Sequence, residues 1–288
     1  MTSPSNLNRS TPQTLVDNVL HLVSLPEIYL RLQQVLDNPN HTRQQVAEVV
    51  SYDPSLSARV LRIANSSYYG FQNKIDNVST AVNVIGEIEL HNIVLATTVV
   101  STMSSLDQEG LDIDEFWLHS VKCGATARLI GKAVGGCNAE NLFLCGMLHD
   151  LGILILYRNE NELANSVAWQ MHDQRQSRDQ AEQAMLGFDH AKIGGLLALA
   201  WRLTPLLQEV IECHHQPEFA NQYRRESEIM CLSNLLAHPD FVIDHFMAEA
   251  DQDSRMLAET LSMDYRIVPE IVENAQLQCS EIQSIICG

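Results

Sequence analysis

The stretch GMLHDLGILIL at residues 146–156 places a histidine and an aspartate side by side in a very apolar part of the chain. A buried ionised carboxylate without a partner is so costly that it becomes protonated or acquires a compensating charge. We therefore expect His149 and Asp150 to mark a functional site, with partners that come from other segments of the chain.

The apolar run around this pair, residues 142–157, is too short and too polar at its centre for a membrane span. The N-terminal residues MTSPSNLNRSTPQ show no positively charged region followed by an apolar stretch, so they do not resemble a signal peptide. We expect a cytoplasmic protein with no membrane partner.

The net charge and the cysteines exclude further classes of function. The 288 residues carry a formal net charge of −18 and contain no cluster of Lys and Arg. Nucleic-acid binding normally begins with a basic patch, so we expect no nucleic-acid partner. The seven cysteines form no C-x-x-C pair, and several lie in apolar helical patterns. We expect reduced core thiols rather than disulfides or a zinc knuckle.

Helical periodicity runs through almost the whole sequence, without persistent strand-like alternation or an internal repeat. Thr42 and Gln45 form a capping-box pattern, and Asp53 followed by Pro54 is typical of a helix start. These patterns predict an all-α fold made of two packed helical lobes.

Residues 79–96 (STAVNVIGEIELHNIVLA) predict two helices hinged at Gly86. Helix–turn–helix pairs often read DNA, but the second helix carries Glu87 and Glu89 where a DNA reader presents Arg, Lys or Asn. We therefore expect this pair to serve helix packing.

The polar, acidic segment 104–116 (SSLDQEGLDIDEF) predicts the boundary between the two lobes. We expect residues 1–11 to form a disordered tail, residues 12–110 the first lobe and residues 111–288 the second lobe. The sequence from Val268 onward predicts an amphipathic helix that closes the second lobe.

Six side chains of the second lobe lie in or near apolar helical segments: His119, His149, Asp150, His190, His214 and His215. Imidazole and carboxylate are common ligands of transition metals. Side chains from separate helices could meet only in the centre of a bundle, where bundles build metal sites. An isolated histidine, however, is ordinarily a satisfied core or surface residue, and a buried His–Asp pair can serve only to hold helices together. Spacing alone leaves these interpretations open.

The order of these residues resembles that of the HD superfamily of metal-dependent phosphohydrolases. His119 is followed by GMLHDLG at 146–152, DHAKIG at 189–194 and the histidine pair at 214–215. The segment DPSLSARVLRIANSSYYG at 53–70, ahead of such a lobe, closely resembles the HDOD domain, a helical signalling relative of that superfamily. The resemblance extends from about residue 25 to near residue 237.

This resemblance implies that the six side chains correspond to the metal-ligand positions of catalytic HD and HD-GYP proteins. Those proteins have an aspartate where this chain has Asn234, a neutral and weaker ligand. HD-GYP enzymes also have a lysine at the position of Ile153, and HHE and GYP segments that are absent here. The implied cofactor is one divalent transition metal ion (Fe, Mn, Zn or Ni), with no organic cofactor.

The implied function is that of a signal-transduction module that contacts other signalling proteins. An oligomer of this chain is compatible with that function. The alternative is a metal-dependent phosphohydrolase or phosphodiesterase, with Asp150 as its catalytic candidate. A two-metal phosphoesterase needs bridging carboxylates and cations for the phosphate, whereas Asp150 is the only carboxylate of the set and the chain is acidic. These absences favour a metal site retained without catalysis, and we assign no catalytic residue.

Overall fold

The computed structural model describes residues 10–104, 109–248 and 251–287, and within them every regular element is a helix. The first helices are α1 (Pro12–Val19), α2 (Glu27–Leu36), α3 (Arg43–Ser51), α4 (Pro54–Ala64), α5 (Val78–Ile85) and α6 (Glu87–Met103). The middle helices are α7 (Ile113–Val134), α8 (Ala139–Leu148), α9 (Leu151–Asn159), α10 (Asn161–Gln174), α11 (Arg178–Leu186), α12 (His190–Ala200) and α13 (Pro205–Cys213). The last elements are η1 (Pro217–Phe219), α14 (Arg224–Ala237), α15 (Ile243–Met247), α16 (Gln252–Thr260), η2 (Tyr265–Ile267) and α17 (Val268–Ile286). The predicted all-α fold is confirmed.

Polar caps set where the early helices begin. The Thr42 hydroxyl accepts the Gln45 backbone N–H, and the Gln45 side chain accepts the Thr42 N–H, so the predicted capping box is confirmed. Asp53 accepts the N–H groups of Ser55 and Leu56 at the start of α4. These side chains satisfy backbone donors that a helix start leaves without partners.

The predicted hinge at Gly86 is also confirmed. Gly86 has φ of +92°, in a region that favours glycine, and α5 and α6 meet there with a bend of 116°. Buried residues lie all round α6, and even Glu89 is only 4% exposed. The helix pair therefore serves packing, as its acidic second helix indicated.

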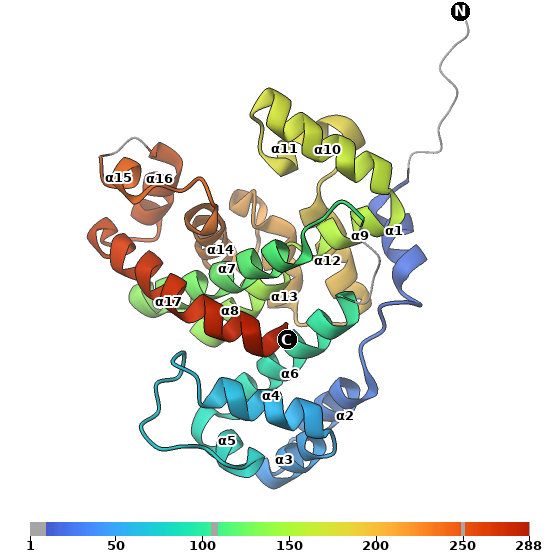
Figure 1. Cartoon of the computed structure of the whole chain (residues 1–288), viewed down its shortest axis with the longest axis vertical. Coiled ribbons are helices and arrows are strands. Elements are labelled where there is room, and N and C mark those ends of the chain that lie inside the picture. The colour runs from blue at the N-terminus through green and yellow to red at the C-terminus, as the bar shows by residue number, and fades with distance from the viewer. Residues whose placement is uncertain (1–9, 105–108, 249–250, 288) are drawn as a thin grey trace, which may run out of the picture.

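The helices form two groups in space, joined by α6 (Figure 1). α2 to α5 lie together at the bottom of the view, and α6 connects them to α8 in the upper group. α1 does not join the helices that follow it, because it packs against α9 and α12. The Trp201 indole N–H donates to the Val23 carbonyl at 2.8 Å, which ties the segment after α1 to the upper group.

The predicted boundaries fall partly outside the described residues. Residues 1–9 of the expected tail and residues 105–108 of the expected boundary segment are not described. Thr11, placed in the tail by the sequence, is the N-cap of α1 and accepts the Thr14 N–H. The division into lobes at residues 12–110 and 111–288 stays a prediction.

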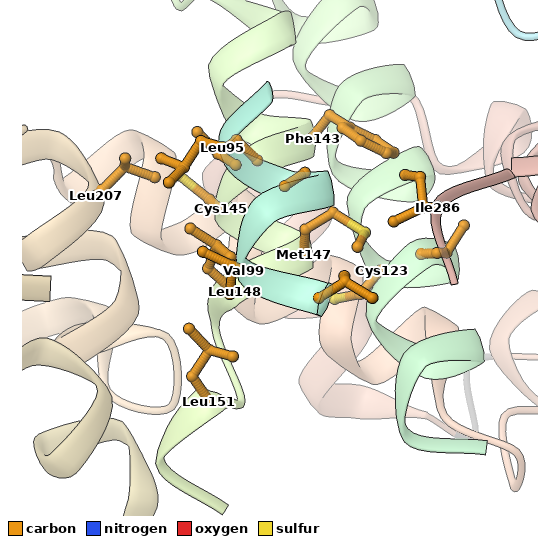
Figure 2. Close-up of a cluster of buried hydrophobic side chains, with 14 of the residues drawn as sticks. Leu95, Val99, Cys123, Phe143, Cys145, Met147, Leu148, Leu151, Leu207 and Ile286 are labelled. Carbon is orange, nitrogen blue, oxygen red and sulfur yellow. The ribbon is translucent and has the colours of Figure 1, made fainter. Parts of the chain in front are cut away.

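One continuous apolar core connects both groups of helices. Figure 2 shows part of it, where Val99 of α6, Met147 of α8 and Leu207 of α13 belong to one buried cluster. Ile286 near the end of α17 belongs to the same cluster, so the C-terminal helix closes the fold.

Within the described residues, the stretch Ala139–Asn159 could cross a membrane by length and composition, with a mean hydropathy of 1.5. The bent pair α5–α6 passes the same test if it is counted as one span. Yet 83% of the window in Ala139–Asn159 is buried inside the fold, and core helices of soluble proteins pass this test too. The burial fits the sequence-based expectation of no membrane span.

α7 and α8 approach each other so closely that only glycines fit between them. A Cβ atom added to Gly146 would lie 2.3 Å from the backbone N and Cα of Gly124. This approach brings the C-terminal end of α8, where the HD pair follows, against the middle of α7.

We predict that Gly146→Ala lowers the free energy of unfolding by about 1–3 kcal/mol or more, because the added methyl group must push two backbones apart. Urea unfolding would measure the loss. Gln180→Ala, at an exposed position in α11, is the control and should stay within about 0.5 kcal/mol of the wild type. Equal stability of Gly146→Ala and the wild type would contradict this account of the contact.

Candidate metal centre

The HD pair lies at a break between two helices, not inside one as its apolar surroundings suggest. His149 is the C-cap of α8, and Asp150 has φ of −96° and ψ of 7° just before α9 begins. A Cβ atom on Gly152 would lie 2.0 Å from the His190 carbonyl oxygen, so glycine is required for α9 to start against α12. The break therefore directs Asp150 toward the start of α12.

The structure brings the five predicted histidines together with Asp150 in one cluster. On one side, Asp150 Oδ2 lies 3.2 Å from His149 Nε2 and 3.7 Å from His119 Nε2 of α7. On the other side, Asp150 Oδ1 lies 3.1 Å from His190 Nε2 and 3.7 Å from His214 Nε2. His215 Nε2 lies 2.9 Å from His190 Nε2. Their clustering is established, and their role as ligands stays a prediction.

Two of the imidazoles are held with a free nitrogen pointing into the cluster. His149 Nδ1 donates to the Gly146 carbonyl at 2.8 Å, and His214 Nδ1 donates to the Ile211 carbonyl at 2.7 Å. Because a carbonyl only accepts, Nδ1 carries the proton and Nε2 of a neutral ring keeps its lone pair. Both Nε2 atoms are buried without a hydrogen-bond partner. Buried acceptors of this kind fit a bound cation.

Glu182 of α11 is a member of the site that the sequence analysis missed. Its side chain is fully buried, and Oε2 accepts both the His190 backbone N–H at 2.7 Å and the His190 Nδ1–H at 2.6 Å. A carboxylate behind a histidine fixes the orientation of the ring that faces a metal. The sequence offered one weak signal, an acidic residue eight positions before a histidine that begins an apolar helix.

Burial and charge set opposite protonation states within the cluster. Burial lowers the pKa of His119 to about 4 and that of His215 to about 3, and holds the pKa of His214 well below its usual range. Burial alone would also lower the pKa of His190, but Glu182 and Asp150 outweigh it and raise that pKa to about 10. Three rings are therefore neutral near pH 7, as metal ligands must be.

Asp150 stays ionised although it is buried. Burial alone would raise the pKa of its carboxyl, but His149 and His190 outweigh burial and hold it well below its usual range. Within the described residues, the basic side chains within 4.0 Å of the Asp150 carboxylate are all histidines, and His119 and His214 among them are uncharged near pH 7. Behind His190, Arg178 Nη1 lies 3.8 Å from Glu182 Oε1.

Two further side chains lie at the His119 side of the cluster. Asn234 Oδ1 of α14 lies 3.0 Å from His119 Nε2, so the position that the resemblance singled out does reach the site. Cys123 of α7 offers a thiol close to His119 and His149. All seven cysteines are free, as predicted, but treating Cys123 as an ordinary core thiol overlooked its histidine neighbours. Ile153 is buried and brings no charge.

A family model for the HDOD domain matches residues 22–217. The chain therefore belongs to the HDOD domain family, as the sequence pattern indicated.

Solved structures share the fold across nearly the whole chain. A protein from Shewanella amazonensis SB2B, named "Putative phosphohydrolase", is 27% identical with a TM-score of 0.78, over 94% of this chain and 97% of that chain. An HDOD domain protein of unknown function from Geobacter sulfurreducens is 22% identical with a TM-score of 0.74, over 96% of this chain and 97% of that one. A "Putative signal transduction protein" from Marinobacter aquaeolei VT8 is 19% identical with a TM-score of 0.70, over 95% of this chain and 61% of that chain.

An uncharacterized protein of Treponema pallidum (strain Nichols) is 22% identical over an alignment 283 residues long, which covers 92% of this chain and 55% of the relative. The chain thus spans about half the length of this curated relative.

We predict that the metal-free protein loses stability as the pH falls from 7 to 5. Below pH 6.5 the unfolded chain binds protons at His119, His214 and His215, whose pKa values are lowered on folding. Each such histidine lowers the free energy of unfolding by up to about 1.4 kcal/mol per pH unit. His190, with its raised pKa, acts in the opposite sense, since its contribution is fully present below pH 6.5 and is lost toward pH 10.

Urea midpoints of chelator-treated protein at pH 7 and pH 5 test this prediction. His215→Gln should show a smaller difference than the wild type, and His172→Gln, at an exposed position in α10, should show the full difference. Identical midpoints at both pH values would contradict it.

We predict that Glu182→Gln weakens metal binding about 10- to 100-fold, because the amide loses the charge that orients His190, whose ring lies 3.1 Å from the Asp150 carboxylate. Chelator competition would measure the affinity. Glu212→Gln, at an exposed carboxylate paired with Lys192, should bind as the wild type does. Unchanged affinity in Glu182→Gln would show that His190 does not need this partner.

Proposed function

We propose that this HDOD protein is a regulatory module that holds one divalent transition metal ion and acts through contacts with signalling proteins, without hydrolysing a substrate. The observation that carries the proposal is a single buried carboxylate facing four imidazole Nε2 atoms at 3.1–3.7 Å, two of them without a hydrogen-bond partner. The proposed ligands are drawn from the six clustered side chains: His119, His149, Asp150, His190, His214 and His215.

The donor set supports a transition metal. Groups of ligand atoms that lie within 4.8 Å of one another include His190, His214 and His215, and also His149, Asp150 and His214. Imidazole nitrogen with one carboxylate oxygen suits zinc, iron, manganese or nickel better than magnesium or calcium. A metal bound here would act as a positive charge that balances Asp150 and satisfies the free Nε2 atoms.

The surroundings argue against phosphoester hydrolysis. Catalysis with two metals uses carboxylates that bridge both ions and cations that neutralise the phosphate. Here Asp150 is the one carboxylate that the described ion pairs place against the inner histidine nitrogens, and Ile153 lies where the resemblance expected lysine. The net charge of −18 also opposes attraction of an anionic substrate.

Contacts with signalling proteins are supported by membership of the HDOD family and by the name of one similar protein. HDOD domains resemble output or adaptor modules, and the similar Marinobacter protein is named for signal transduction. The hydrolase remains the second candidate, because all six side chains of the HD pattern meet in space and the Shewanella protein is named a phosphohydrolase. Direct assays separate the two candidates.

We predict roughly one tightly bound transition metal ion per chain in the purified protein, lost in His149→Ala because a buried ligand is removed. Elemental analysis would measure the content, before and after reconstitution. His172→Ala is the control, since His172 is exposed and should keep the ion. No metal in the wild type after reconstitution would refute the metal site.

A turnover assay addresses the absence of catalysis. Cyclic dinucleotides, nucleoside phosphates and a generic phosphodiester should be hydrolysed no faster by the metal-loaded protein than by the metal-free control. Metal-dependent hydrolysis that disappears in Asp150→Asn would replace the regulatory proposal with the phosphohydrolase.

A further inference from the structure

The Asp150 carboxylate divides the cluster into two halves with different donors. Oδ2 faces His119 and His149, and Oδ1 faces His190 and His214. The second half has a further anion, because Glu182 hydrogen-bonds to His190 from behind. The first half has no second carboxylate among its described contacts, and Asn234 offers it only a neutral amide.

Cys123 lies in this first half. It follows His119 by four residues in α7, and residues at that spacing share one face of a helix. Ligand atoms of His119, Cys123 and His149 all lie within 4.8 Å of one another. Two ligands of a tetrahedral zinc ion lie about 3.5 Å apart, so small side-chain rotations bring the three atoms onto one ion. Cys123 is fully buried, as is His149, whose Nε2 has no hydrogen-bond partner.

We propose that Cys123 binds the metal ion as a thiolate, together with His119, His149 and Asp150, and that the ion is of the zinc type. This inference rests on the proposed metal site and locates the ion in the Oδ2 half. The thiol proton leaves to solvent as the sulfur–metal bond forms. A sulfur donor beside two imidazoles favours zinc over manganese, which prefers oxygen ligands.

Charge balance supports the thiolate. A divalent ion beside Asp150 alone would leave one net positive charge in a buried site, which is costly to desolvate. A thiolate at Cys123 brings the ion and its ligands to neutrality. The thiol thus supplies the negative charge that the neutral Asn234 does not.

The competing explanation is that Cys123 is an ordinary core residue. Figure 2 places it in the buried apolar cluster, together with Cys145 of α8. Cys145 is as fully buried as Cys123, but it belongs to no group of clustered ligand atoms found among the described residues. Replacement of either thiol by serine should destabilise the core to a similar extent, because both side chains are fully buried. Cys145→Ser is therefore the matched control.

The test is replacement of the native ion by cobalt(II) in the whole protein, read by absorption spectroscopy, and titration with zinc against a chelator. Cobalt(II) bound to a thiolate gives an intense charge-transfer band in the near ultraviolet, and cobalt(II) bound only to nitrogen and oxygen does not. We expect the band in the wild type and in Cys145→Ser, and its loss in Cys123→Ser. We also expect zinc affinity to fall at least about tenfold in Cys123→Ser.

The outcomes separate this inference from the metal site itself. If the wild type binds cobalt(II) and zinc without the band, and Cys123→Ser binds equally well, the thiolate ligand is refuted and the metal site stands. If the wild type binds neither ion, the proposed metal site fails, and the inference fails with it. Circular dichroism of each variant confirms that a lost band does not reflect unfolding.

Discussion

The negative charge of Asp150 has to be balanced inside an apolar bundle, and the packing around it follows from that requirement. The α8–α9 break places the carboxylate where α7, α12 and α13 can each deliver an imidazole within 3.7 Å. Glycines make this convergence possible: Gly146 lets α8 approach α7, and Gly152 lets α9 start beside the carbonyl of His190. Close backbone contacts and a buried ion-pair network therefore belong to one arrangement.

Local signals in the sequence were enough to predict most of the fold, because caps and periodicity act over a few residues. The Thr42 capping box, the Asp53 cap and the Gly86 hinge are all determined by neighbouring groups. The resemblance identified the six side chains that cluster in the structure. Their spacing alone did not decide between a metal site and ordinary core or surface residues. The break at His149 was not predicted, since hydrophobicity continues across it on both sides.

What the sequence did not predict depends on contacts between distant segments. Glu182 sits in a polar helical pattern typical of an exposed face, and only its contact with His190 shows why it is buried. The packing of α1 against α9 and α12 and the hydrogen bond from Trp201 to Val23 likewise join residues that are far apart in the chain. The sequence alone did not distinguish Cys123 from the six other cysteines, because its histidine neighbours come from the fold.

A metal ion bound at this centre would have a structural effect that requires no hydrolysis. An ion that binds only the folded arrangement of helices adds its binding free energy to the stability of that arrangement. The proposed ligands His119 and Cys123 lie on α7, and His149 and Asp150 lie at the α8–α9 break, so a bound ion would stabilise the position of α8 against α7. α7 and α8 also contact α17 and α6, and α6 reaches the helices α2, α4 and α5. Under the proposed function, a bound ion would therefore act on the surface formed by the first helices through these packed helices, without a substrate.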